Sequence, residues 1–451
     1  MSYPKNFSGK CLLAFLIGGL LGGYGLAQEA IKSAGPAKVE VRQADGRWQL
    51  FVNQKPFFIK GAGLEFGDQE KLAAAGGNSF RTWRTENGQE TGRQVLDRAR
   101  NNGLFVTMGL DVERERHGFD YSNAVDVAKQ FAEIKAEVLQ FKDHPALLMW
   151  DIGNELNLNA HNPKVWDAVN ELSKMIHQVD PNHPTTTSLA GISKELVDEI
   201  KARAPDLDLL SVQSYADIVN LPRELRDSGW NGPYVVTEWG ATGHWECGKT
   251  AWDAPIEDDS SVKAECYRKR YQIAIAADTN NCLGSYVFLW GQKQERTPTW
   301  YGMFLPTGEA TETVDMMQNL WTGDWPKFRS PQLKGFWIEG KTARENVHLQ
   351  AGQSYAAKTL AQSPDAAPLK YSWEVMAESG AKTTGGDFES QPQRLAGLVA
   401  EGTGAEAQIT APAKPGAYRL FVYVRDCHGK AAYANLPFYV DATSGSMASR
   451  P

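Results

Sequence analysis

The chain has 451 residues, of which 42% are hydrophobic and 22% are charged. This composition is typical of a globular protein and excludes a disordered chain. The length suits a domain of about 250–300 residues together with a smaller one. The net charge of −7 is spread along the sequence without a concentrated basic patch, which argues against nucleic acid as a partner. The 14 tryptophans suit sugar stacking, although core packing uses this residue as well.

The first 27 residues have the pattern of an export signal. Lys5 and Lys10 precede an apolar run over residues 11–21, and small residues follow it up to Ala27. Because the run is short and rich in glycine for a spanning helix, we expect cleavage after Ala27, with an uncleaved membrane anchor as the alternative. The expected location is secreted or periplasmic, and membrane contact is expected only if this segment stays attached.

Export permits disulfides. Cys247 and Cys266 flank one loop, and we expect them to form a bond; the alternative is that they are buried free thiols, together with Cys282 and Cys427. No spacing of Cys and His residues resembles a zinc site, so we predict neither a metal nor a cofactor.

Apolar residues alternate between Val39 and Val52 around Asp45-Gly46 and predict a β-hairpin. Beyond it, eight apolar runs alternate with helical stretches such as residues 131–139 and 165–176. Continuous apolar runs are typical of parallel strands that helices cover on the outside. Eight of them over roughly 270 residues predict an α/β fold, the (β/α)8 barrel. A doubly wound open sheet is the alternative, weakened because no Gly-rich phosphate loop follows an early strand. The runs cover residues 56–61, 79–83, 104–110, 146–151, 185–189, 207–211, 234–237 and 282–290.

Helical periodicity fades after Pro326. Alternating runs at 371–375, 407–409, 418–424 and 432–440, punctuated by Gly and Pro, predict an Ig-like β-sandwich of about 110 residues. It could bind a glycan or a partner, or brace the barrel; because it shows no decisive aromatic platform, bracing is its expected role. The predicted division is a signal or anchor segment (1–27), a catalytic barrel (37–325), the sandwich (330–441) and a disordered tail (442–451).

Two glutamates that end apolar runs are the candidate catalytic pair. Glu155 follows the fourth run and Glu238 ends the seventh. Because catalytic groups of such barrels lie at the C-terminal ends of the strands, these carboxylates are expected to face each other across the barrel mouth. Two carboxylates flanking a sugar are the machinery of a retaining glycosidase. A pair of purely structural carboxylates is the alternative.

With Asn154-Glu155 after the fourth run and Thr237-Glu238-Trp239-Gly240 after the seventh, the chain resembles glycoside hydrolase clan A, which includes families 2 and 5. The resemblance covers roughly residues 39–321. It implies that Glu155 is the acid/base and Glu238 the nucleophile.

The resemblance also implies roles for four neighbours of the pair. Arg81 would hold Glu238 ionised and Tyr215 would donate a hydrogen bond to it. Asn154 would bind the 2-hydroxyl of the sugar, and Trp290 would form the floor of the subsite.

The chain departs from family 5 after the sixth run, where Gln213-Ser214-Tyr215 replaces His-x-Tyr, and after the third, where Asp111 replaces a frequent histidine. These changes leave the two carboxylates untouched. Further candidates for sugar contacts, with solvated or salt-bridged side chains as the alternative, are Gln213, Trp239, Glu65, Asp111, Trp83, His244, Trp245, Gln292, Lys293, Glu295 and Arg296.

These features predict an exported retaining β-glycoside hydrolase with carboxyl groups about 5–5.5 Å apart. Its expected partner is a β-linked oligo- or polysaccharide, a glucan first and a mannan next. A transglycosylase, in which a sugar acceptor replaces water, is a close alternative. A non-catalytic carbohydrate-binding scaffold of the cell envelope is the alternative from another class.

Overall fold

The computed structural model describes residues 35–382, 385–400 and 404–442. The predicted signal segment therefore lies outside the described residues, as does the predicted tail beyond residue 442. No helix in the described ranges has the length and apolar character needed to cross a membrane.

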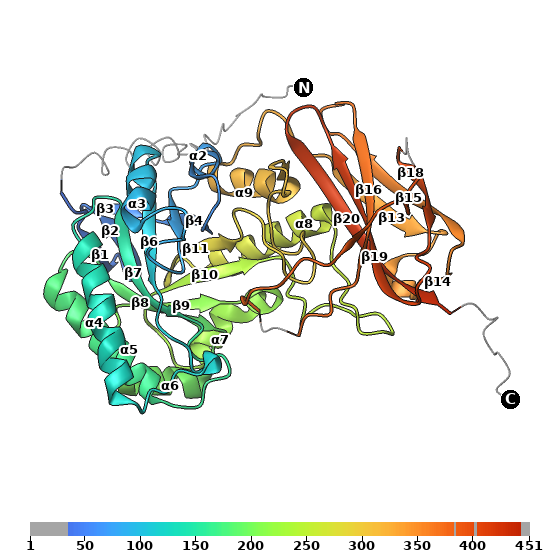
Figure 1. Cartoon of the computed structure of the whole chain (residues 1–451). Helices are drawn as coiled ribbons and strands as arrows, with labels where there is room; N and C mark the ends of the chain where they lie inside the picture. The colour runs from blue at the N-terminus through green and yellow to red at the C-terminus, as the bar shows by residue number, and fades with distance from the viewer. Residues whose placement is uncertain (1–34, 383–384, 401–403, 443–451) are drawn as a thin grey trace, which may run out of the picture.

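Eight parallel strands close into a barrel in the order β10-β11-β4-β5-β6-β7-β8-β9 (Figure 1). The predicted barrel is thus confirmed, and all eight apolar runs form its strands because each is buried between the barrel interior and the outer helices. The first strand begins later than predicted, since Lys55–Phe57 pair with the N-terminal hairpin instead. The strands are β4 (Ile59–Gly63), β5 (Ser79–Arg81), β6 (Phe105–Leu110), β7 (Leu147–Asn154), β8 (Thr185–Ala190), β9 (Leu210–Gln213), β10 (Tyr234–Gly240) and β11 (Cys282–Phe288).

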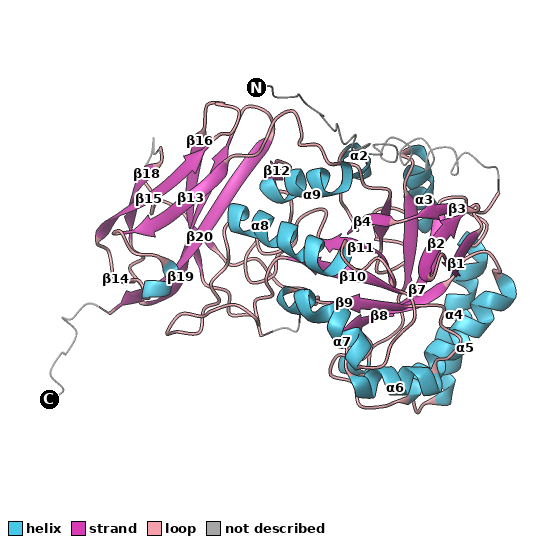
Figure 2. Ribbon diagram, turned by 180° about the vertical axis from the view of Figure 1, so that it is seen from behind, coloured by secondary structure: helices cyan, strands magenta, loops and turns pink. Residues whose placement is uncertain are grey.

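Helices surround the barrel, and Figure 2 shows α4, α5 and α6 along one side of it. The predicted apolar stripe of α5, from Val165 to Ile176, is buried as expected. In α4 the stripe is narrower than predicted, because Leu139 is exposed to solvent. The helices are α2 (Gln69–Ala74), α3 (Gly92–Asn101), α4 (Ala124–Phe141), α5 (Lys164–Val179), α6 (Lys194–Arg203), α7 (Leu221–Asp227), α8 (Ser260–Arg270) and α9 (Glu312–Thr322).

The predicted hairpin forms a three-stranded sheet of β1 (Val39–Ala44), β2 (Arg47–Val52) and β3 (Lys55–Phe57). Its turn needs two residues with positive φ, which Asp45 and Gly46 supply. The Val39 amide donates to the Asn182 carbonyl and the Trp48 amide to the Asn280 carbonyl, just before β8 and β11 begin. The sheet therefore closes the N-terminal end of the barrel.

Two layers of mainly antiparallel strands follow the barrel and pack face to face around a shared core that includes Ile338, Ile409, Leu420 and Phe438. The predicted sandwich is confirmed as a β-domain. The strands β13, β14, β15 and β17 were not predicted. One layer contains β12 (Ala310–Thr311), β20 (Lys430–Asp441), β19 (Gly416–Arg425), β16 (Lys370–Ala377) and β17 (Arg394–Leu395), with β14 (His348–Gln350) beside β20; the other contains β13 (Gln332–Ile338), β15 (Ser354–Gln362) and β18 (Glu406–Thr410).

The sandwich is held to the barrel by a buried polar network around Lys263 of α8. The Lys263 ammonium donates to Glu257 at 2.5 Å, to the Thr299 carbonyl at 2.8 Å and to the Tyr433 hydroxyl of β20 at 3.0 Å. Asn435 of β20 donates to the same Glu257. Because a buried charge is costly without such partners, this network fixes the sandwich against the barrel in one position.

The predicted disulfide between Cys247 and Cys266 is wrong, because all four cysteines of the described residues are free thiols. Cys247 donates to the His244 carbonyl, while Cys266 lies on α8. Burial raises the pKa of both thiols, so they stay protonated.

Candidate active site

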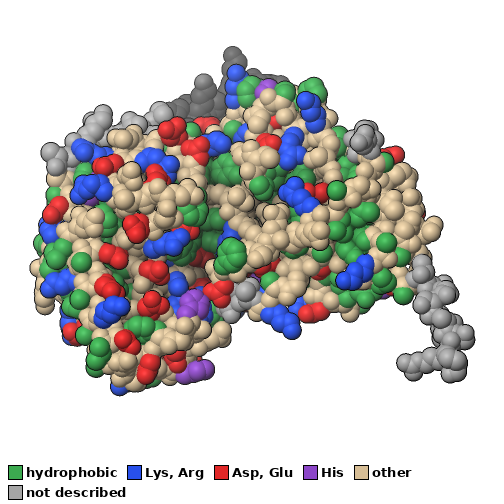
Figure 3. Space-filling view, in the orientation of Figure 1, with side chains coloured by type: hydrophobic (Ala, Val, Ile, Leu, Met, Phe, Trp, Pro, Cys, Tyr) green, Lys and Arg blue, Asp and Glu red, His purple; other side chains and the backbone are tan. Residues whose placement is uncertain are grey.

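A pocket of about 1230 Å³ opens at the C-terminal ends of the barrel strands. Figure 3 shows the surface hollowed between the barrel and the C-terminal sheets. The volume exceeds the roughly 300–1,000 Å³ of sites for drug-sized ligands. The pocket thus has room for a ligand of several rings.

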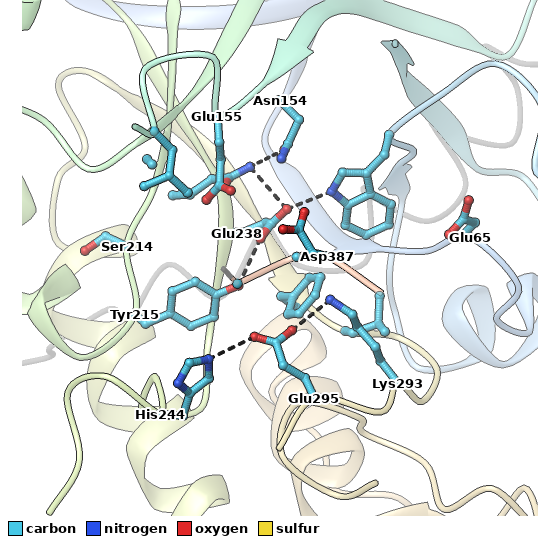
Figure 4. Close-up of a pocket in the computed structure, with 18 of the residues that line it drawn as sticks. Glu65, Asn154, Glu155, Ser214, Tyr215, Glu238, His244, Lys293, Glu295 and Asp387 are labelled. Carbon is cyan, nitrogen blue, oxygen red and sulfur yellow. Dashed lines mark hydrogen bonds and ion pairs between the residues drawn. The ribbon is translucent and has the colours of Figure 1, made fainter. Parts of the chain in front are cut away.

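Glu238 lies near the end of β10, at the centre of the pocket in Figure 4, and accepts hydrogen bonds from four side chains. Its Oε1 accepts from Arg81 at 2.7 Å, Trp83 Nε1 at 2.8 Å and Gln213 Nε2 at 3.1 Å. Its Oε2 accepts from the Tyr215 hydroxyl at 2.9 Å. These four donors hold the Glu238 carboxyl in one orientation.

Arg81, at the end of β5, is fully buried and links Glu238 to the floor of the barrel. It donates to Asp151 Oδ2 at 2.9 Å and to Asn154 Oδ1 at 2.6 Å. Burial disfavours its charge, but the two carboxylates outweigh burial and the pKa of Arg81 is raised. The guanidinium is therefore a permanent cation under the pocket.

Glu155 follows β7 in a left-handed backbone conformation, with a φ of 52°. A residue with a side chain rarely adopts this conformation, and such residues cluster at functional sites. The pairing of β7 with β8 is irregular between Asp151 and Asn154, and the Glu155 amide donates to the Ser188 carbonyl at 2.8 Å. This irregular end turns the Glu155 carboxyl into the pocket, as Figure 4 shows.

The electrostatic surroundings of Glu155 are unlike those of Glu238. Burial, and then the charge of Glu238, raise the pKa of Glu155 to about 7. The nearest cation is Arg116, whose Nη1 lies 3.9 Å from Glu155 Oε2 and partly opposes this rise. Glu155 can therefore carry a proton near neutral pH. Sequence reasoning missed Arg116, which lies in a segment of mixed charge after the third strand, Glu113-Arg114-Glu115-Arg116-His117.

Asn154 and Gln213 complete the centre of the site. Asn154 Oδ1 accepts from Arg81 and, at 2.7 Å, from Gln213 Nε2. Among the described residues Asn154 Nδ2 has no hydrogen-bond partner, so it is left to donate to a ligand. Gln213, where the family 5 pattern has histidine, joins the acid/base side of the site to Glu238.

Several other predicted residues line the pocket in ion pairs. Glu65 pairs with Arg84 at 2.5 Å. His244 and Lys293 both contact Glu295, at 3.3 and 2.7 Å. These side chains line the pocket, where they could contact a ligand, and they are also engaged in salt bridges. The structure is therefore compatible with both interpretations of the sequence. Asp111, Trp245 and Gln292 also line it.

Two predicted sugar contacts, Trp290 and Trp239, have buried rings, although Trp290 is among the residues that line the pocket. The Trp290 ring is fully buried, donates to the Asp68 carbonyl at 3.0 Å and packs on Trp321. The strand ends at Phe288, and this ring lies at the pocket against Trp83. The Trp239 ring is also fully buried, against Tyr267, because successive side chains of a strand point to opposite faces and Glu238 occupies the inner one.

The sandwich contributes residues to the pocket, so it does more than the bracing that was its expected role. Gly385, Gly386, Asp387 and Phe388, between β16 and β17, all line it. Asp387 Oδ1 lies 3.1 Å from His117 Nε2. No local sequence signal indicates this contact. Within the described part of the chain, no three His, Cys, Asp or Glu side chains are grouped as a metal ion would require.

No family model matches the sequence. Solved structures share its fold, each with a TM-score of 0.50. The β-D-glucuronidase of Dictyoglomus thermophilum is 18% identical over 65% of this chain and 54% of its own. The β-glucuronidase of Bifidobacterium dentium, complexed with coumarin-3-O-glucuronide, is 18% identical over 64% of this chain and 50% of its own. The family 2 β-galacturonidase of Eisenbergiella tayi, bound to galacturonate, is 16% identical over 64% and 54%.

The chain spans about half the length of these proteins. At this identity the likeness establishes the fold. The barrel fold that the resemblance to glycoside hydrolase clan A implies is confirmed.

Proposed function

We propose that the protein is a retaining β-glycoside hydrolase with Glu238 as nucleophile and Glu155 as acid/base. The observation that carries this proposal is the contrast between the two carboxylates. Four donors fix the Glu238 carboxyl in place, whereas burial and the charge of Glu238 raise the pKa of Glu155 to about 7. One carboxyl group that can hold a proton beside another that is fixed by hydrogen-bond donors is what a general acid and a nucleophile in one site require.

In the first step a Glu238 oxygen attacks the anomeric carbon. Oε1 is engaged by three donors and Oε2 by Tyr215 alone, so Oε2 keeps the lone pair for attack. The bond from the anomeric carbon to the glycosidic oxygen breaks, and Glu155 gives its proton to that oxygen. The free Nδ2 of Asn154 donates to the 2-hydroxyl of the sugar, a contact that strengthens in the transition state.

In the second step Glu155 acts as a base. Forming the ester removes the charge of Glu238, which is one of the causes that raise the pKa of Glu155. The pKa of Glu155 therefore falls, and its carboxylate accepts a proton from water. The water oxygen bonds to the anomeric carbon, the ester bond breaks and the Glu238 carboxylate is restored. The same geometry thus serves both halves of the reaction.

The proposed substrate is a β-linked glycan, first a glucan and then a mannan. The solved structures of similar fold are named as β-glucuronidases and a β-galacturonidase, which supports a β-glycoside and adds uronic acid glycosides to the panel to be tested. Export rests on the basic and apolar pattern of residues 1–27.

The test is hydrolysis of a β-glycan panel by the protein without residues 1–27, beside Glu238→Ala and Glu155→Ala. Glu238→Ala should lose activity by a factor on the order of 10⁴ or more. Azide should rescue each variant with opposite stereochemistry: a β-glycosyl azide from Glu155→Ala, where azide attacks the ester, and an α-glycosyl azide from Glu238→Ala, where it replaces the nucleophile. Glu133→Ala, on the exposed side of α4, is the control. Activity that survives Glu238→Ala, or an inverted product from the parent, would refute the assignment.

A further inference from the structure

A short segment of the sandwich, Gly385–Glu389, lies across the pocket, and we call it the strap. Its C-terminal end is fixed to the barrel loop after β11. Glu389 is buried, and its Oε1 accepts from the Arg296 amide at 3.0 Å and from Ser379 Oγ at 2.6 Å. This anchoring by a buried carboxylate holds the strap against the barrel.

The strap reaches the opposite side of the pocket at Asp387. This carboxylate lies 3.1 Å from His117 Nε2 and 3.8 Å from Arg116 Nη2. Arg116 is also the cation beside Glu155. At its other end, Gly385 lies against Trp245: a Cβ at Gly385 would be 3.5 Å from that ring. The strap therefore connects the wall formed by Trp245 with the wall next to the proposed acid/base.

Phe388 lies between Asp387 and Glu389, which are both held by contacts with the barrel. Phe388 itself is 86% exposed. Six phenylalanine and tryptophan side chains of the described residues are exposed, and three of them line the pocket: Phe66, Trp245 and Phe388. An exposed aromatic ring at a pocket is a surface for a ligand with an apolar face. The apolar face of a pyranose ring is such a surface.

We propose that the strap forms the subsite for the leaving group, in which Phe388 stacks on the sugar ring that departs. This inference rests on the proposed function. Because Glu155 protonates the glycosidic oxygen, the departing sugar begins at the Glu155 carboxyl. The strap reaches this carboxyl through a single residue, Arg116. The sandwich thus supplies specificity for a glycan whose leaving group is itself a sugar.

The test compares two leaving groups on the full chain. β-Glycosyl fluorides of glucose, mannose, galactose and glucuronic acid release fluoride, which has no ring to stack. β-Linked disaccharides with the same reacting sugars release a second sugar. The quantity measured is kcat/KM, since it reports the steps up to departure of the leaving group.

Phe388→Ala should lower kcat/KM on the disaccharide about three- to tenfold and leave the fluoride unchanged. Phe388→Tyr should restore the disaccharide rate, because the ring is kept. Phe58→Ala is the matched control, since Phe58 is also exposed and does not line the pocket.

Unchanged disaccharide rates in Phe388→Ala would overturn the inference and leave the proposed function standing. An equal loss on fluoride and disaccharide would also overturn it, because the ring would then act on the reacting sugar or on the fold. Failure of the parent on every fluoride and disaccharide would remove the proposed function and the inference together.

Discussion

The surroundings of Glu238 and Glu155 differ although both side chains end strands of one barrel. Glu238 is surrounded by donors, among them the buried Arg81. Glu155 has burial and a neighbouring negative charge, with Arg116 at 3.9 Å. The comparison teaches that the fold assigns the roles of two identical side chains through their neighbours. Changes to those neighbours test it.

The largest effect is expected from Arg81→Met, which removes the cation on the Glu238 side. Asp151 and Glu238 would remain buried without it, at a cost of about 3–5 kcal/mol in the free energy of unfolding. Activity should be lost as well. Denaturant unfolding measures the cost, with Arg84→Met as control, since its exposed pair with Glu65 is worth about 1 kcal/mol or less. Equal stability of the two variants would contradict the role given to Arg81.

Tyr215→Phe removes the hydrogen bond to Glu238 Oε2 and keeps the ring. A hydrogen bond to a charged group contributes about 1.5–3 kcal/mol, so kcat/KM should fall roughly 10- to 100-fold. Tyr355→Phe removes a sandwich hydroxyl that, among the described residues, accepts a hydrogen bond only from the Gln350 amide, and this variant should leave kcat/KM unchanged. A similar rate for the two variants would show that Oε2 needs no donor.

The pH dependence tests the Glu155 side. Glu155 must be protonated to act as acid, so kcat/KM should fall as pH rises through about 7, the raised pKa of Glu155. Glu238→Gln removes a negative charge that raises this pKa, and the pKa of Glu155 should therefore decrease. Carbon-13 NMR of labelled glutamate measures it in both proteins. An unchanged pKa would mean that the two carboxylates do not interact.

The smallest effect is expected from Asp387→Asn in the strap. Arg116 lies between Asp387 and Glu155, so with Asp387 neutral its charge should act more strongly on Glu155. The basic limb of the pH profile should then move to lower pH, whereas Arg116→Met should move it to higher pH. If both variants shifted the basic limb in the same direction, the charge of Arg116 would not control the pKa of Glu155.

The barrel and the pair of glutamates were predictable because the information is local. Each strand is a short apolar run, and the ordinal of a strand fixes where its end lies around the mouth. The buried position of Trp239 was also predictable, since Glu238 faces inward and its neighbour must face outward. The buried position of the Trp290 ring was not predictable, because it depends on the path that the chain takes after β11 ends at Phe288.

The strap could not be predicted from the sequence. Asp387 meets His117 across a separation of 270 residues, and this contact depends on how the sandwich docks on the barrel. Docking is decided by buried groups such as Lys263, Glu257 and Asn435, whose partners are far apart in the chain. Arg116 was missed for a related reason, since its neighbour Glu155 comes from the next strand along.

The position of the N-terminal hairpin determines how the barrel mouth is oriented when the protein is attached to a support through its N-terminal side. It seals the barrel at the end opposite the pocket, and Figure 1 shows β1–β3 and the C-terminal sheets on opposite sides of the barrel. The first described residues therefore lie at the end of the barrel that is opposite the pocket. Immobilisation on a solid support directly before residue 35 would therefore leave the mouth of the barrel facing away from the support.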